Sequence, residues 1–133
     1  MSKDSTVRAM PDRIRLIYHQ GKQILFFDLS NCSASEVEQI ARAAPDYITV
    51  QPRNSVLVLT DFSGAAFDRD ALRAMKETAV FDKPFVKKSA LIGTQSLPRE
   101  FHEAMTSYSR RELLIFKTRE EALDWLAGDS VDA

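Results

Sequence analysis

The sequence has little cysteine, little glycine and almost no excess charge of either sign. Its 133 residues include one cysteine, Cys32, so an internal disulfide and a zinc site built from several cysteines are both excluded. Eighteen basic and nineteen acidic residues give a net charge of -1, which provides no bulk attraction to nucleic acid or to an anionic membrane. We therefore expect a chain that folds by packing alone, without a metal or a cofactor.

Long apolar runs are also missing. No run approaches the roughly 20 residues of a membrane helix, and residues 1–12 are polar and of mixed charge, unlike the apolar region of a signal peptide. The length and the 44% hydrophobic content are typical of one globular domain with a substantial core. We expect a cytoplasmic protein with a single domain over residues 1–133, an ordered core at about 13–128 and tails at 1–10 and 129–133.

The N-terminal third predicts a hairpin followed by a helix. Residues 13–18 alternate between charged and apolar side chains, which indicates an edge strand, and the almost continuously apolar residues 24–29 predict a strand covered on both faces. Ser33 and Glu36 have the spacing of a capping box at the start of a helix, which Pro45 is expected to end.

Residues 46–54 are expected to form a connector, in which the letters YITV allow a short extended piece but Pro52 disfavours a central strand. The letters SVLVLT at 55–60 leave no face for solvent and predict the central strand. The remaining predicted elements are a helix capped by Asp68, a strand at 85–92, a helix at 98–107, a strand at 113–116 and a final helix between a capping box at Thr118 and a cap at Gly128.

This alternation predicts an α/β fold with about five strands in a mostly parallel sheet, an N-terminal hairpin and about four helices packed against the sheet. In such sheets ligands bind beyond the carboxyl ends of the strands. The side chains at those positions are Asp61, Phe62, Ser63, Gly64, Gly93, Thr94, Gln95, Ser96, Lys117 and Thr118. Turn formation and helix capping explain most of them without a ligand, and we favour these structural roles.

Catalytic and metal sites find little support. A hydrolase would need Ser63 as nucleophile, His102 or His19 as base and Asp61 as the orienting carboxylate. Asp61 and Ser63 share one turn, and no GxSxG motif surrounds the serine. The letters FDRD at 67–70 offer only two carboxylates beside an arginine. We expect no catalytic residue and no metal.

Eight phenylalanines are the more suggestive feature. With the methionines they either fill the core or line an apolar pocket between sheet and helices, and the core is the more common outcome. The residues predicted to line such a pocket are Phe26, Phe62, Phe67, Met75, Phe101 and Met105.

The order of elements, together with SVLVLTDFSGAAFD, resembles the SpoIIAA-like branch of the STAS superfamily over about residues 13–128. The stretches RIRLIYHQGKQILFFDLSNCS, KPFVKKSALIG and LLIFKTREEALDWLAG support the resemblance. It implies a protein that is not an enzyme, since characterised STAS domains are anti-sigma factor antagonists that bind a kinase, or regulatory domains of anion transporters. The similarity of this branch to CRAL-TRIO lipid-binding folds also implies a carrier of apolar molecules.

The antagonists carry an Asp-Ser-Ser-Gly motif whose first serine accepts phosphate. Matching by letters sets this motif on residues 61–64 and the acceptor on Phe62; matching by strand and helix start sets it on residues 66–69. Neither alignment places a serine at the acceptor position, although Ser63 lies one place along. Asp68 places a permanent negative charge near that helix start. An imitation of the phosphorylated state is one explanation of this charge, and an ordinary helix cap explains it equally well.

Two functions follow from the resemblance and the composition. The first is a regulatory or protein-interaction module that binds an unknown protein through residues 61–70 and the following helix, with Phe62 or Phe67 outward and with a homodimer as one arrangement. The second is a carrier or sensor of a small apolar molecule. Neither involves nucleic acid or stable membrane insertion. The residues assigned to ligand or partner binding are Asp61, Phe62, Ser63, Gly64, Phe67, Asp68, Met75, Thr94, Gln95, Phe101 and Met105.

Overall fold

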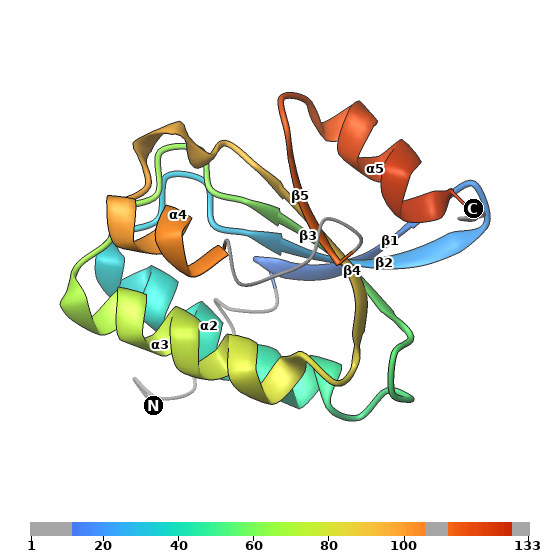
Figure 1. Ribbon diagram of the computed structural model, residues 1–133, viewed down its shortest axis with the longest axis horizontal. Helices are drawn as coiled ribbons and strands as arrows, with labels where there is room; N and C mark the ends of the chain where they lie inside the picture. The colour runs from blue at the N-terminus through green and yellow to red at the C-terminus, as the bar shows by residue number, and fades with distance from the viewer. Residues whose placement is uncertain (1–11, 106–111, 129–133) are drawn as a thin grey trace.

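The computed structural model describes residues 12–105 and 112–128, and it shows a sheet with helices on both faces (Figure 1). The elements in chain order are β1 (Ile14–His19), β2 (Lys22–Asp28), α2 (Ala34–Ile48), β3 (Val56–Asp61), α3 (Arg69–Asp82), β4 (Val86–Ile92), the short 3-10 helix η1 (Thr94–Ser96), α4 (Arg99–Met105), β5 (Leu113–Phe116) and α5 (Arg119–Ala127). The two predicted tails and the last two residues of the predicted helix at 98–107 lie outside the described residues.

The five strands lie in the order β1-β2-β3-β4-β5, so β1 is an edge strand and β3 is central, as predicted. Strands β1 and β2 pair antiparallel, and the remaining pairs are parallel. Gln20 and Gly21 join the hairpin, and both have positive φ angles, which match the twist of a two-residue hairpin turn. The predicted α/β fold is therefore confirmed.

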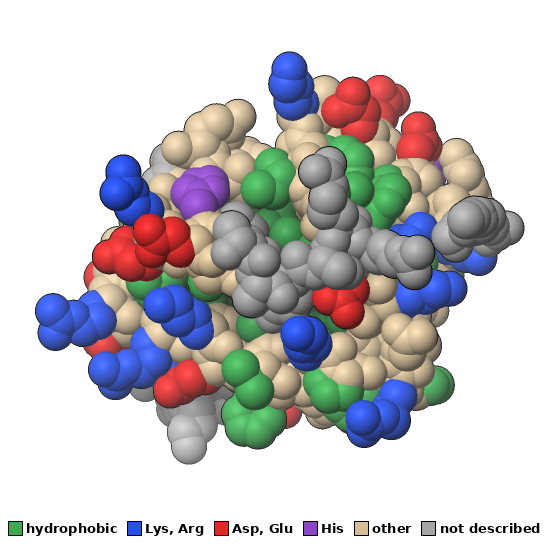
Figure 2. Space-filling model, in the orientation of Figure 1, with side chains coloured by type: hydrophobic (Ala, Val, Ile, Leu, Met, Phe, Trp, Pro, Cys, Tyr) green, Lys and Arg blue, Asp and Glu red, His purple; other side chains and the backbone are tan. Residues whose placement is uncertain are grey.

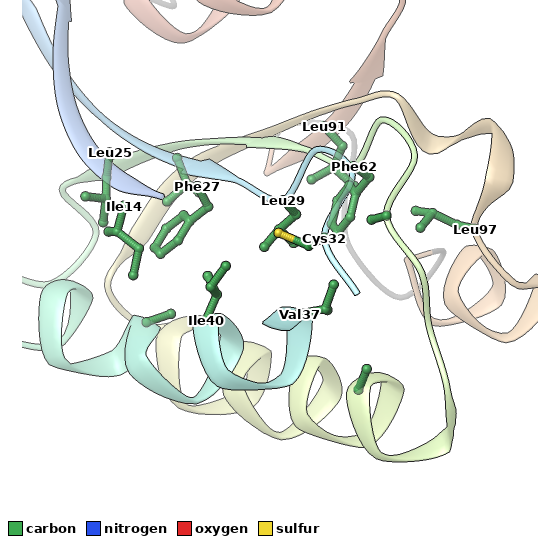
Figure 3. Close-up of a cluster of buried hydrophobic side chains, with 14 of the residues drawn as sticks. Ile14, Leu25, Phe27, Leu29, Cys32, Val37, Ile40, Phe62, Leu91 and Leu97 are labelled. Carbon is green, nitrogen blue, oxygen red and sulfur yellow. The ribbon is translucent and has the colours of Figure 1, made fainter. Parts of the chain in front are cut away.

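Two hydrophobic clusters flank the sheet, because successive residues of a strand point to opposite faces. One lies between the sheet and the layer of α2, α3 and α4 and includes Phe27, Ile40 and Phe62 (Figure 3). The other lies beneath α5 and includes Phe26 and Leu126. Figure 1 shows α2 and α3 together on one face of the sheet and α5 on the other.

The helix caps follow the sequence closely. Ser33 and Glu36 form a complete capping box, with hydrogen bonds of 2.8 and 3.1 Å between side chain and backbone in both directions. The Asp68 carboxylate accepts the amide of Ala71 at 2.8 Å. The Thr118 hydroxyl accepts the amide of Glu121 at 3.2 Å. These bonds satisfy amides that have no partner within their own helix.

The prediction that Pro45 ends its helix is wrong, because α2 continues through Pro45 to Ile48. A proline has no amide hydrogen, so the carbonyl of Ala41 loses its usual helical donor. The buried Thr78 hydroxyl of α3 donates to that carbonyl at 2.8 Å. Residues 46–48 are therefore helical. The short extended piece that the letters YITV allow does not form.

We predict that Thr78→Val, which removes the hydroxyl and keeps the shape, lowers the free energy of unfolding by about 1–3 kcal/mol, because a buried carbonyl is left without a donor. Chemical denaturation measures this. The exposed Thr49 hydroxyl, which donates to the Pro45 carbonyl at 2.7 Å, provides the control, and Thr49→Val is expected to cost less.

A double-mutant cycle gives the sharper test. In a Pro45→Ala background the helix regains an amide donor for the Ala41 carbonyl, so Thr78→Val is expected to cost less there than in the wild-type protein. Equal costs in both backgrounds would contradict this account of α2.

Candidate functional site

A cavity of about 330 Å³ lies between the sheet and the layer of α2 and α3. Its volume falls within the range of small-molecule sites, roughly 300–1,000 Å³. Most of its wall is apolar. The sheet contributes Phe27, Val58, Leu91 and Leu113, α2 contributes Ile40, Ala44 and Ile48, and α3 contributes Leu72, Met75 and Ala79.

The wall of the cavity extends along α3. This helix returns from the carboxyl end of β3 to the amino end of β4, and residues from Leu72 to Asp82 line the cavity. Ten residues at 1.5 Å each span about 15 Å. Phe62 and Phe101 lie at the end near the carboxyl edge of the sheet, and Val86, the first residue of β4, lies at the other. The cavity wall therefore extends from one edge of the sheet to the other.

Three predicted residues share the wall of the cavity, namely Phe62, Met75 and Phe101. The rings of Phe62 and Phe101 meet edge-on with centroids 5.1 Å apart. The half-buried Phe67 packs against both rings at 6.1 and 5.6 Å, behind the wall rather than in it. These contacts close the carboxyl end of the cavity with a group of aromatic rings.

Phe26 was predicted to line the cavity, and this is wrong. It belongs to the cluster beneath α5, with the guanidinium groups of Arg15 and Arg119 at 5.0 and 4.5 Å from its ring. Of the two rings that the interaction module would turn outward, Phe62 is fully buried and Phe67 is half-buried. The side chain of Met105 lies outside the described part of the structure.

The polar residues after the strands form turns and caps. The Asp61 carboxylate accepts the amide of Ser63 at 2.9 Å, and Gly64 has the positive φ of a tight turn. Gly93 lies against this turn, so closely that a Cβ there would be 2.5 Å from the Ser63 nitrogen. Beyond Gly93, Thr94 is buried and Gln95 is exposed. None of these residues lines the cavity.

The residues of the rejected hydrolase arrangement do not come together. His19 lies 2.8 Å from the Asp124 carboxylate, at the hairpin tip beside the amino ends of the parallel strands. Ser63 follows the carboxyl end of β3 and lies at the opposite edge of the sheet. Because strands β2 to β5 run parallel, the length of the sheet separates the two side chains.

The buried Cys32 thiol has a raised pKa because burial disfavours the thiolate. Within residues 12–105 and 112–128, no group of three or more histidine, cysteine or carboxylate side chains is placed to hold a metal ion. The same residues include no helix with the length and apolar character that a membrane crossing requires.

Asp82 is the site residue that sequence analysis missed. This last residue of α3 lines the cavity and is 6% exposed, and its Oδ1 atom accepts no hydrogen bond in the described part of the chain. Burial raises its pKa from 3.8 to about 7. Its spacing of four residues from Thr78 and seven from Met75 places it on the inward side of α3, and this was the available sequence signal.

Among solved structures, the chain is similar to the crystal structure of an uncharacterized protein of the DUF3478 family from Shewanella loihica PV-4, which has a SpoIIAA-like fold. The TM-score is 0.67 at 18% sequence identity, and the match covers 86% of this chain and 92% of that chain. No protein-family model matches the sequence, and no curated protein matches it either. The likeness shows that this chain has a SpoIIAA-like fold, as the sequence resemblance implied.

We predict that Asp82 makes the protein less stable as the pH rises. The folded state keeps a proton on this carboxyl that the unfolded chain releases. The proton's contribution to the free energy of unfolding is therefore complete below about pH 4 and is lost as the pH rises through about 7. The full effect is on the order of 4 kcal/mol. The other charged side chains of the cavity wall are Lys76, Lys83 and Glu112.

Denaturation of Asp82→Asn between pH 4 and 8 measures this contribution, since asparagine does not ionise. The difference in unfolding free energy between the variant and the wild-type protein is expected to change across this interval. The same substitution at exposed Asp70 is the control. A constant difference at Asp82 would show that its carboxyl ionises as easily in the folded protein as in the unfolded chain.

We also predict that Gly93→Ala destabilises the protein more than Gly21→Ala. Both glycines have positive φ angles, of 70° and 79°, so each substitution costs about 1–2 kcal/mol of backbone strain. Only at Gly93 does the added methyl group collide with the backbone of Ser63, whereas Gly21 has open space. Thermal unfolding of the two variants compares these costs, and equal losses would contradict the close approach of the two loops.

Proposed function

We propose that this SpoIIAA-like protein binds a small apolar molecule in the cavity between the sheet and α3, as a carrier or sensor that catalyses no reaction on it. The observation that supports this most directly is a space of about 330 Å³ with a mostly apolar wall. Such spaces are the usual form of a small-molecule site.

The energetics of a mostly apolar cavity favour an apolar ligand. Water in such a cavity finds few hydrogen-bond partners on the wall, whereas an apolar molecule makes dispersion contacts with the wall atoms. An apolar molecule also removes its own surface from water, at roughly 25 cal/mol for each Å² buried. Binding therefore needs few polar contacts, in keeping with the turn and cap roles of the loops after the strands.

The cavity reaches the surface beside α3. Lys76, Val80 and Lys83 all contribute to its wall and are exposed. Lysine side chains can cover apolar surface with their methylene groups. We infer that a ligand enters along this side of α3.

A protein-interaction module is the second candidate, and one observation favours it. Val80 and Phe81 near the end of α3 are 73% and 68% exposed. Figure 2 shows hydrophobic side chains along the lower edge of the molecule, where α3 lies in Figure 1, among lysines and arginines. Exposed apolar groups of this size are typical of a surface that contacts another protein. In this alternative the helix that follows residues 61–70 contacts a regulatory partner.

Filling the cavity tests the proposed function. We predict that Ala79→Phe, which places a ring in the cavity wall, weakens binding of the apolar dye Nile red at least about tenfold, equivalent to ~1.4 kcal/mol. Fluorescence titration measures the affinity, and thermal unfolding confirms that the variant is folded. Exposed Ala66, which does not line the cavity, gives the matched control Ala66→Phe, and that variant is expected to bind as the wild type does.

If Nile red binds Ala79→Phe as tightly as it binds the wild-type protein, the result would contradict binding inside the cavity. Phe81→Ser then distinguishes the alternatives, because it removes the exposed ring of α3 and leaves the cavity wall unchanged. If Phe81→Ser loses Nile red binding and Ala79→Phe keeps it, the dye binds at the exposed apolar surface of α3. That result would favour the protein-interaction module.

A further inference from the structure

We propose that Asp82 is the recognition group of this cavity, and that the ligand is a long apolar molecule ending in a hydrogen-bond donor, either a hydroxyl or an amine. This inference rests on the proposed function, since it names the class of molecule that the same cavity takes. It depends on three observations: a buried oxygen that accepts no hydrogen bond from the described residues, neighbours that do not satisfy it, and the position of that residue at one end of the cavity.

The first observation is the condition of Asp82 itself. Its side chain is almost completely buried, and its Oδ1 atom accepts no hydrogen bond within the described residues. Buried polar atoms nearly always have a partner, because an unmade hydrogen bond in the interior costs free energy. Since Asp82 also forms part of the cavity wall, a ligand in the cavity can supply the missing donor.

The second observation concerns the neighbouring groups. Thr78, one helical turn earlier, has a single hydroxyl hydrogen and donates it to the Ala41 carbonyl. The other charged side chains in the wall, those of Lys76, Lys83 and Glu112, give Asp82 Oδ1 no hydrogen bond. The site for a donor is therefore open on the cavity side.

The third observation is position. Asp82 ends α3 at the amino edge of the sheet, and its own carbonyl accepts the amide of Phe85 at 2.9 Å, just before β4 begins. Phe62 and Phe101 close the cavity at the carboxyl edge. A ligand therefore lies with its polar group at Asp82 and its apolar tail toward the two rings.

Above about pH 7, where Asp82 is ionised, this arrangement selects against fatty acids, so the test that follows is made at pH 8. A ligand carboxylate beside Asp82 would bring two acidic groups together in an apolar space, where only one can ionise without a large cost. A hydroxyl donates to Asp82 whether or not its carboxyl is protonated, and an ammonium group pairs with the ionised form. The raised pKa of Asp82 has burial as its cause, which disfavours the charged carboxylate.

Displacement of Nile red by three ligands of equal chain length tests the inference. Decanol, decylamine and decanoate are titrated below their micelle concentrations into the wild-type protein and into Asp82→Leu. Leucine is close to aspartate in shape and needs no hydrogen-bond partner, so the variant is expected to fold. The matched control is Asp70→Leu on the same helix, because Asp70 is exposed and lies outside the cavity wall.

We expect decanol and decylamine to bind the wild-type protein at least about tenfold more tightly than decanoate. In Asp82→Leu that preference is expected to disappear through weaker binding of the two donors, while Nile red, which has no hydrogen-bond donor, keeps its affinity within about twofold. Asp70→Leu is expected to keep the preference.

Two further outcomes separate this inference from the proposed function. If Nile red binds but the three ligands displace it equally, or if Asp82→Leu keeps the preference, the role of Asp82 is overturned and the apolar cavity still stands. If neither Nile red nor any of the three ligands binds the wild-type protein, the proposed function fails and the inference fails with it.

Discussion

The hydrogen bond from the Thr78 hydroxyl to the Ala41 carbonyl fixes the position of α3, and the cavity depends on that position. It exists because Pro45 supplies no amide hydrogen to α2. An ion pair between Arg42 and Glu77, 3.3 Å apart, joins the same two helices nearer the surface. These contacts hold α3 beside α2. The space between α3 and the sheet then remains partly unfilled.

The two faces of the sheet differ because of side-chain size. Beneath α5 the contact includes Ala90 and Ala122, both fully buried, so the helix backbone approaches β4 closely. On the other face large side chains such as Phe27 and Ile40 stand between sheet and helices and hold the layers apart (Figure 3). The cavity accordingly lies on the side of α2 and α3.

Local sequence predicted the elements well, because alternation, capping residues and glycine positions act over a few residues. It failed where the cause lies far along the chain. Thr78, which compensates for Pro45, is thirty-three residues away in the sequence and cannot be recognised from the helix alone. Phe26 was placed in the cavity because a continuously apolar strand does not show which residue faces which layer. Asp82 was overlooked because an aspartate at a helix end is usually solvated.

The hydrogen bond between Thr78 and Ala41 also couples the unfolding of α2 to that of α3. Without α3 in place, the buried carbonyl of α2 has no donor, so separation of α3 from the body of the protein leaves α2 with a defect in its hydrogen-bonded ladder. We therefore expect the two helices to form one cooperative unit, a foldon whose amide protons exchange with solvent through a shared opening. Since α3 provides part of the cavity wall, the proposed carrier would exchange a bulky ligand through the same opening.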